Sequence, residues 1–288
     1  MDQISKSKLH VGRSHYDANY GNFQTALYEQ IRREAFGEDI GQNSWLTADE
    51  QDKFLTWLDL SPSKNLLDVA CGAGGPALRM ATLTRCSVVG IDVHEQAVST
   101  ARSVATQRGL SRLAEFLVAD AAEQLPFSNA AFDAITCIDA INHLSDRRHA
   151  IAESARLLKQ GGRLLFTDPV TVTGPLTNAE ISVRSWAGFN LFVPPDYNER
   201  IIEQCGLQLL VRKDLTANMP EVAERRGTAR ASRSTVLREI EGDQTYEAEQ
   251  EFFAVASRLA REARLSRLVY VAEKNWAVAD HESAKMEE

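Results

Sequence analysis

A buried strand that runs into a glycine turn and then directly into a helix constrains this chain more than any other feature. The stretch is NLLDVACGAGGPALRMA, residues 65–81. Its first six residues form an apolar run of strand length, Gly72, Gly74 and Gly75 allow a tight turn, and Pro76 suits a first helical position. This order of elements is typical of a nucleotide-type cofactor site.

The charges around the turn indicate which cofactor it holds. Dinucleotide-binding proteins have G-x-G-x-x-G at such a turn, but Ala70 stands where the first glycine is expected. Asp68 lies inside the strand just before the turn, and its negative charge favours a cationic ligand group over a pyrophosphate. Asp92 ends the next predicted strand, CSVVGID, about 20 residues after the turn, which is the spacing of a ribose-binding acid.

The following segments repeat the pattern of a strand that ends on a polar residue. LAEFLVADAAEQLPF, residues 113–127, gives a third strand ending on Asp120. AAFDAITCIDAINHL, residues 130–144, gives a fourth strand that ends in a polar cluster. AIAESARLLKQGGRLLFTD, residues 150–168, gives a helix, a Gly-Gly turn and a fifth strand ending on Asp168. This alternation predicts a parallel sheet covered by helices on both faces.

The strand-end acids and the motifs DAAEQLPF, FD and LLKQGGRL, in this order, resemble the class I S-adenosylmethionine-dependent methyltransferases. The resemblance covers roughly residues 60–170 and extends more loosely to residue 274. It implies an α/β fold with a Rossmann-like, seven-stranded, mostly parallel sheet and helices on both faces. It also implies S-adenosyl-L-methionine as the cofactor and a small-molecule acceptor, as in natural-product sugar O-methyltransferases and in the N-methyltransferases of glycine derivatives and phosphoethanolamine.

The resemblance also assigns parts of the cofactor to positions in this chain. The expected contacts are Asp68, Ala70, Gly72 and Gly74 for the methionine end, Asp92 and Val93 for the ribose, and Asp120 and Ala121 for the adenine, with Ile138 beneath. Gln42 and Trp45, in the loop GQNSW, are expected to touch the ligand as well. The cofactor has an ammonium, a sulfonium and a ribose diol but no phosphate, so acids at strand ends suit it.

The remaining segments are predicted to surround the core. The expected division is an N-terminal helical cap at 1–60, the methyltransferase core at 61–214, a helical lid insertion at 215–264, the final core strand at 265–274 and a disordered tail at 275–288. Thr47 is expected to cap a helix of the first segment. Apolar residues recur at helical intervals in the insertion, so we expect it to bury one face and to roof the cleft at the strand ends.

The candidate catalytic residues follow the fourth and fifth strands. His143 is expected to take a proton near neutral pH, and Asp168 to orient or assist it. Asp139 and Asn142 are expected at the same cleft mouth. The alternative for His143 is that it only shapes the site.

Composition limits the partners. The net charge of −8 argues against nucleic-acid binding, and we interpret the arginines of residues 225–238 as a solvated helix face. No apolar run approaches the ~20 residues of a membrane span, and the N-terminus lacks the apolar core of a secretory signal, so we expect a cytoplasmic protein. The four cysteines lack metal-ligand spacing, and we predict buried thiols and no metal site. A homodimer is left open.

Three functions remain open at this point. The first is a small-molecule methyltransferase with an oxygen or nitrogen acceptor, which the sequence does not identify further. The second is an NAD(P)-dependent oxidoreductase, which Asp68, Ala70 and the lack of a recognisable Tyr-x-x-x-Lys pair disfavour. The third is a catalytically inactive cofactor-binding module.

Overall fold

Seven strands form one sheet. A computed structural model describes residues 15–16 and 18–275, so the start of the predicted cap and nearly all of the predicted tail lie outside the described residues. The strands are β1 Asn65–Val69, β2 Ser87–Asp92, β3 Ala114–Val118, β4 Phe132–Cys137, β5 Leu158–Val172, β6 Leu207–Asp214 and β7 Leu265–Lys274. Their order is β3-β2-β1-β4-β5-β7-β6, and β7 runs antiparallel to both of its neighbours. The predicted Rossmann-like, mostly parallel sheet is confirmed.

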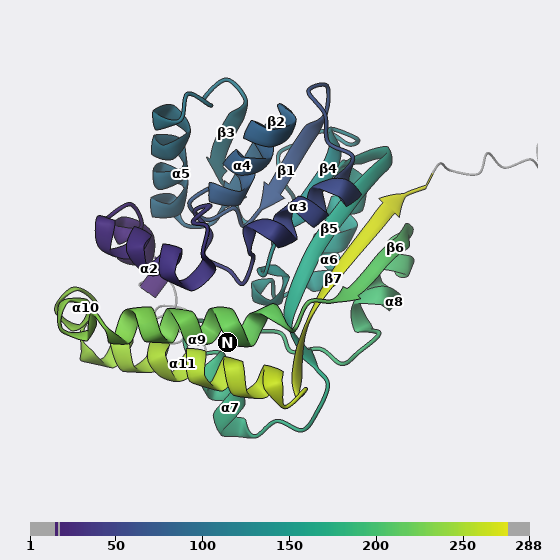
Figure 1. Cartoon of the computed structure of the whole chain (residues 1–288). Helices are drawn as coiled ribbons and strands as arrows, with labels where there is room; N and C mark the ends of the chain where they lie inside the picture. The colour runs from purple at the N-terminus through teal and green to yellow at the C-terminus, as the bar shows by residue number, and fades with distance from the viewer. Residues whose placement is uncertain (1–14, 17, 276–288) are drawn as a thin grey trace, which may run out of the picture.

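Helices cover both faces of this sheet (Figure 1). Their bounds are α2 Ala26–Phe36, α3 Ala48–Leu58, α4 Gly75–Thr84, α5 Glu95–Gln107, α6 Arg147–Leu157, α7 Asn178–Arg184, α8 Tyr197–Gln204, α9 Asn218–Ala231, α10 Ser234–Glu241 and α11 Asp243–Arg261, with a 3-10 turn at Ile141–His143. Side chains of α3, α4 and α5 share one buried cluster with the sheet, and those of α6 and α8 share the other. No helix in the described part combines the length and apolar character needed to cross a membrane.

The fifth strand is longer than predicted. It begins at Leu158 and passes through the expected Gly-Gly turn, and it continues beyond Asp168 to Val172 because β7 pairs with it there. Pro169 lies where the register between β5 and β7 shifts. A proline is tolerated at such an irregularity because no ladder hydrogen bond requires its missing N–H.

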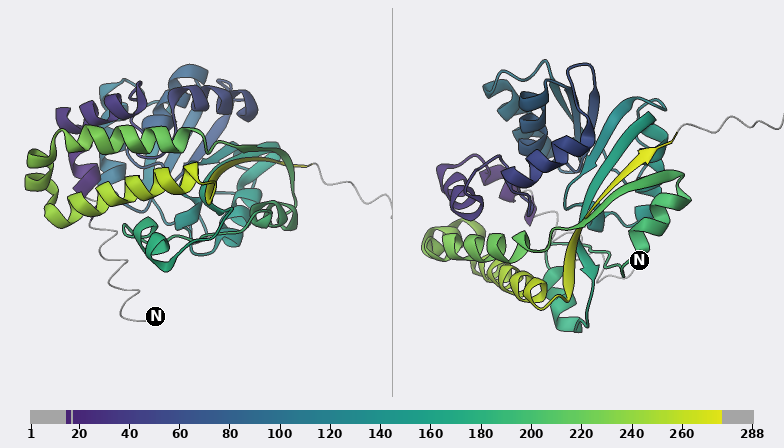
Figure 2. Two further views of the ribbon diagram at one scale, coloured as in Figure 1. Left: turned by 60° about the horizontal axis from the view of Figure 1, so that its bottom comes forward. Right: turned by 45° about the vertical axis from the view of Figure 1, so that its right-hand side comes forward.

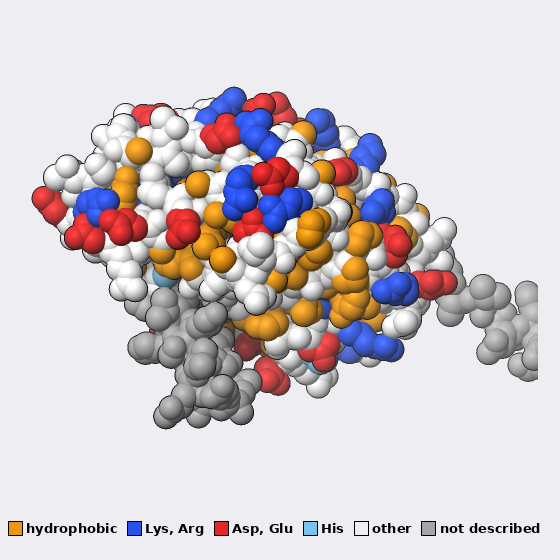
Figure 3. All heavy atoms as spheres, turned by 90° about the horizontal axis from the view of Figure 1, so that it is seen from below, with side chains coloured by type: hydrophobic (Ala, Val, Ile, Leu, Met, Phe, Trp, Pro, Cys, Tyr) orange, Lys and Arg blue, Asp and Glu red, His pale blue; other side chains and the backbone are white. Residues whose placement is uncertain are grey.

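Helices α9, α10 and α11 follow β6 in the chain and precede β7, where the sequence predicted an insertion. The two long helices lie side by side below the carboxyl ends of the central strands (Figures 1 and 2). Apolar side chains of α2, α9 and α11 form a common cluster, whose members include Phe36, Met219 and Phe253. Seen from below, acidic and basic side chains lie next to one another on the outer surface (Figure 3). The insertion therefore buries one face, as its periodicity predicted.

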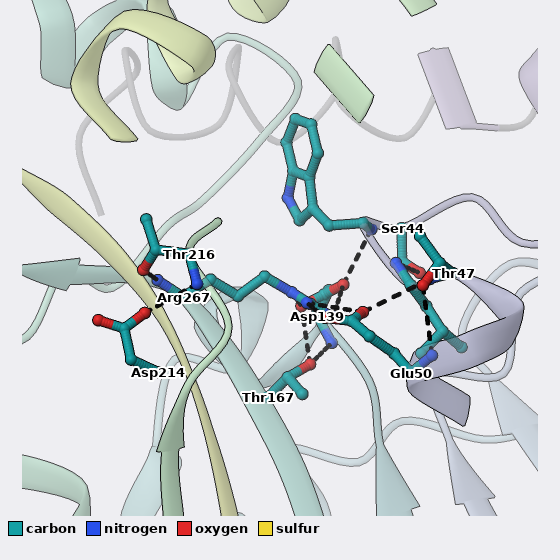
Figure 4. A network of polar contacts seen from close by, with 10 residues as sticks. Ser44, Thr47, Glu50, Asp139, Thr167, Asp214, Thr216 and Arg267 are labelled. Atoms are coloured by element: carbon teal, nitrogen blue, oxygen red, sulfur yellow. Dashed lines mark hydrogen bonds and ion pairs between the residues drawn. The ribbon is translucent and has the colours of Figure 1, made fainter. Parts of the chain in front are cut away.

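A buried ion-pair network joins residues that lie far apart in the sequence (Figure 4). Arg267 of β7, with no exposed surface, donates through Nη1 to both carboxylate oxygens of Glu50 in α3, at 2.8 and 2.9 Å. Its Nε and Nη2 donate to the two oxygens of Asp139, after β4, at 2.7 and 3.1 Å. Glu50 also completes the capping box of α3 with Thr47, which confirms the predicted cap. The network therefore holds α3, the end of β4 and β7 in one arrangement.

Replacing Arg267 with alanine is expected to lower the free energy of unfolding by about 3–5 kcal/mol, because two carboxylates would remain buried without their cation. Urea denaturation of the purified variant measures the loss. The matched control is Arg163→Ala, because Arg163 pairs with Glu273 in the same sheet but both side chains are partly exposed. That variant is expected to lose about 1 kcal/mol or less. Equal losses in the two variants would contradict the role assigned to the network.

Candidate functional site

The turn after β1 needs an unusual backbone and has little room for side chains. Ala70, Gly72 and Gly74 all have positive φ angles, of 56°, 55° and 76°. A Cβ at Gly72 would lie 2.8 Å from the hydroxyl of Tyr20, and one at Gly75 would lie 2.3 Å from two backbone carbonyl oxygens of residues 40 and 41. The positive φ of Ala70 explains why glycine is expected at this position. The turn is thus a close-packed cradle beneath the N-terminal helical segment.

Two acids are buried at this turn. Asp68, 4% exposed, accepts a hydrogen bond from Thr136 Oγ1 at 2.7 Å, and burial raises its pKa to about 7. Asp92, at the end of β2, accepts from the backbone N–H groups of Gly72 and His94, both at 2.9 Å. Neither carboxylate has an ion pair with a lysine or arginine among the described residues. A cationic ligand group would complement them, whereas a phosphate would be repelled.

The other predicted contacts are spread along the ends of the strands. Val93 is 41% exposed, and Asp120 is exposed beyond the end of β3, with its side chain accepting from the backbone N–H of residue 122. Ala121 and Ile138 are partly buried against the two sheet clusters. Gln42 is 1% exposed and bonds to its own loop, with Oε1 accepting from the N–H of residue 40. Gln42 therefore shapes the loop, and the structure does not bring its side chain to a ligand surface.

A cavity, which we call the central cavity, lies between the helices of the insertion and the residues that follow β4. Its described lining comprises His15, Tyr16, Asn19, Asn43, Ser44, Trp45, Asp139, Asn142, His143, Pro169, Arg184, Trp186, Ala187, Asn190, Arg226, Glu249, Phe252 and Phe253. The indole ring of Trp45 stacks on Phe252, with centroids 6.0 Å apart. Tyr16 packs on Tyr20, which covers the glycine turn, so the cavity and the turn are neighbours. Trp45 thus belongs to the cavity wall.

His143 lines the central cavity. Its Nδ1 lies 2.8 Å from the carbonyl oxygen of Phe189. A carbonyl only accepts, so Nδ1 carries the proton of the neutral ring and Nε2 keeps a free lone pair. The His143 residue keeps exposed surface, but partial burial of the ring lowers its pKa below 6.5. The contact with the carbonyl of Phe189 acts in the opposite direction, and the nearby charge of Arg184 lowers the pKa. The ring is therefore neutral at pH 7.

Asp168 does not share this cavity. It has no exposed surface and forms an ion pair with Arg147, and its Oδ2 accepts from Asn198 at 2.9 Å. Both partners come from the helices on one face of the sheet, so the carboxylate points into the protein. The structure therefore gives Asp168 a structural role, contrary to the predicted catalytic one. Asp139 reaches the cavity, but its oxygens are bound by Arg267, Trp45 N and other groups.

Sequence reasoning did not identify the charged residues that the insertion and α7 bring to the cavity. Arg226 and Arg230 were interpreted as part of a solvated face, but Arg226 lines the cavity and Arg230 is 2% exposed, in ion pairs with Glu241 and Glu249. Arg184 of α7 was not singled out, and no local pattern marks it. Its position depends on the packing of α7 against α11.

Comparisons with known proteins agree with this geometry. Residues 67–166 match a family described as a methyltransferase domain. The chain is 33% identical over 157 residues to the 27-O-demethylrifamycin SV methyltransferase of Amycolatopsis mediterranei, a match that covers 51% of this chain and 57% of that protein. It is 31% identical over 156 residues to the O-methyltransferase rstn1 of Aspergillus nomiae, covering 53% of this chain and 68% of that protein.

A solved structure extends the likeness over nearly the whole chain. The cyclopropane synthase MmaA2 of Mycobacterium tuberculosis superposes with a TM-score of 0.76 at 19% identity, covering 90% of this chain and 98% of that one. Identity this low shows the shared fold but no activity. Sequence identity to the curated methyltransferases is higher than to this structure, although the matched region spans little more than half of the Amycolatopsis protein. On this evidence the chain belongs to the methyltransferase family, as its strand-end motifs predicted.

Proposed function

We propose that this protein is an S-adenosyl-L-methionine-dependent methyltransferase that methylates an oxygen or nitrogen atom of a small molecule held in the central cavity. The main support for this proposal is the pair of buried carboxylates, Asp68 and Asp92, which have no ion pair with a lysine or arginine among the described residues. A cofactor with an ammonium, a sulfonium and a diol but no phosphate complements them. When bound, it supplies a methyl group on sulfur that an acceptor lone pair can displace in line.

The residues of the turn fit this cofactor. The positive φ angles of Ala70, Gly72 and Gly74 make a tight turn directly after β1, and the two glycines add no side chain to it. Asp68 is the proposed partner of the ammonium. Asp92 uses one acceptor site of each oxygen for a backbone N–H and keeps further acceptor capacity for the ribose hydroxyls. Val93, Asp120, Ala121 and Ile138 remain proposed contacts of the ribose and adenine.

The cavity supplies the acceptor side of the reaction. His143 Nε2 takes the proton of an acceptor hydroxyl or amine, and its contact with Phe189 fixes the ring. Helices α9, α10 and α11 act as the lid over residues 61–214, which excludes water from the transfer. Asp168 has no part in the proton transfer. The cytoplasmic location remains a prediction, and the oligomeric state remains open.

The competing functions lack such support. A nicotinamide cofactor would place a pyrophosphate against Asp68, which repels it. An inactive cofactor-binding module would not require a neutral histidine with a free nitrogen in the cavity. The acceptors in the names of the relatives, such as a rifamycin, are consistent with a small-molecule substrate of this chain.

Binding of S-adenosylhomocysteine is expected to weaken roughly tenfold between pH 8 and pH 6. The pKa of Asp68 is raised to about 7, so at pH 6 the carboxyl group must lose a proton before it can pair with the ammonium. Isothermal titration calorimetry at both pH values measures this change. Asp68→Asn is expected to bind more weakly and without the pH dependence. No binding at millimolar ligand, or preferential binding of NAD, would contradict the proposed cofactor.

His143→Asn is expected to lower kcat by about a hundredfold or more while binding of S-adenosylhomocysteine is unchanged. Asparagine can still donate a hydrogen bond to the carbonyl of Phe189, but it has no counterpart of Nε2. The wild-type rate, measured with an acceptor obtained from a screen of phenols and amines, is expected to rise with pH to a plateau, with its midpoint below pH 6.5. An unchanged rate in the variant would assign His143 to shaping the site only.

A further inference from the structure

Arg184 differs from the other buried arginines that the structure describes. Four of them have a carboxylate partner: Arg32 with Asp39, Arg147 with Asp168, Arg230 with Glu241 and Glu249, and Arg267 with Asp139 and Glu50. Arg184 is 3% exposed and has no such partner in the described chain. Its charge therefore has no counter-ion among the residues that the structure describes.

The surroundings of Arg184 do not replace that partner. Its Nε and Nη1 atoms are buried without a hydrogen-bond acceptor. The guanidinium lies over the ring of Phe252, 4.3 Å from its centroid, and 5.7 Å from that of Trp45. Ring faces attract a cation but accept no strong hydrogen bond. Burial lowers the pKa of Arg184 to about 10, so the group still carries its charge at neutral pH.

The acids of the central cavity are already engaged. Two carboxylates line it among the described residues, those of Asp139 and Glu249. Both oxygens of Asp139 accept from Arg267. Glu249 lies 3.0 Å from Arg230 and 4.0 Å from Arg226. Arg226 and Arg230 are therefore compensated within the protein, and of the arginines in the described cavity lining Arg184 is the one without an ion pair.

An acceptor atom without a partner lies in the same wall. Asn142 Oδ1 is buried and receives no hydrogen bond, while the Nδ2 atom of Asn142 donates to Asn190. Asn190 in turn donates to the backbone carbonyl of Arg184 at 3.0 Å. The side chain of Asn190 therefore connects Asn142, which has an acceptor without a partner, to the backbone of Arg184, which has donors without partners. A ligand with both an anionic group and a hydroxyl would satisfy the two ends.

We infer that the central cavity selects a hydroxylated organic acid, whose carboxylate binds Arg184 and whose apolar or aromatic body lies against Trp45 and Phe252. The inference rests on the proposed function and narrows its substrate class from any small molecule to a carboxylic acid. A single cation without an ion pair suits a group with one negative charge, such as a carboxylate, better than a phosphate dianion.

The first test needs no ligand. Arg184→Met removes a buried charge that has no partner and keeps much of the apolar volume, so the melting temperature is expected to rise by about 2 °C or more. The matched control is Arg147→Met, which leaves Asp168 buried without its cation and is expected to melt at a lower temperature. A loss of stability or a failure to fold in Arg184→Met would show that the residue is structural and would overturn the inference.

The second test uses two probes of nearly equal shape, meta-hydroxybenzoate and meta-hydroxybenzamide. With the full chain saturated with S-adenosylhomocysteine, the acid is expected to bind at least about tenfold more tightly than the amide, because only the acid balances the charge of Arg184. Fluorescence quenching of the cavity tryptophans, Trp45 and Trp186, follows both titrations. Arg184→Met is expected to lose the preference, and Arg184→Lys to retain part of it.

Equal binding of acid and amide by the wild type, including no binding of either, would overturn the inference. A preference that persists in Arg184→Met would do the same. These readouts do not depend on methyl transfer. If S-adenosylhomocysteine does not bind, the proposed function fails, but the melting temperatures and the same acid and amide titrations without it still measure the charge preference of the cavity.

Discussion

The ion pairs of Arg267 with Glu50 and Asp139 are the interaction on which the arrangement of the site depends. They connect a helix near the start of the chain, the end of a central strand and the last strand, and the bond to Glu50 spans 217 positions of sequence. Asp139 also accepts from the backbone N–H of Trp45 at 2.9 Å, so the same carboxylate places an aromatic wall of the central cavity. A buried guanidinium holds such partners in fixed positions because leaving either side unpaired is costly.

Unpaired charges of opposite sign lie on the two sides of the cleft. At the glycine turn, Asp68 and Asp92 are buried without a lysine or arginine partner in the described chain. In the cavity, Arg184 is buried without a carboxylate partner. The other buried charges of the described residues are paired, as in the contact of Arg147 with Asp168. The cleft therefore complements a cation at the turn and an anion under the insertion, and Tyr16 and Tyr20 lie between them.

Features governed by local rules could be predicted from sequence. The alternation of strands and helices, the glycine turn and the cap at Thr47 depend on neighbours within a few residues, and all three are found in the structure. The acid Asp92 could be placed for the same reason, because it ends a strand of recognisable length. Strand β5 ran beyond its predicted end because a partner strand from the far end of the chain extends it.

The sequence by itself thus determined the sheet, the cofactor-type turn and the family, since periodicity, turn residues and strand-end acids are written in short segments. Only the tertiary structure decided which charged side chains are free to meet a ligand. Asp168 in β5 and Arg184 in α7 are both buried charged residues, yet one is neutralised by Arg147 and the other has no ion pair among the described residues. That difference arises because an ion pair depends on where distant segments pack, and no local pattern of residues records it.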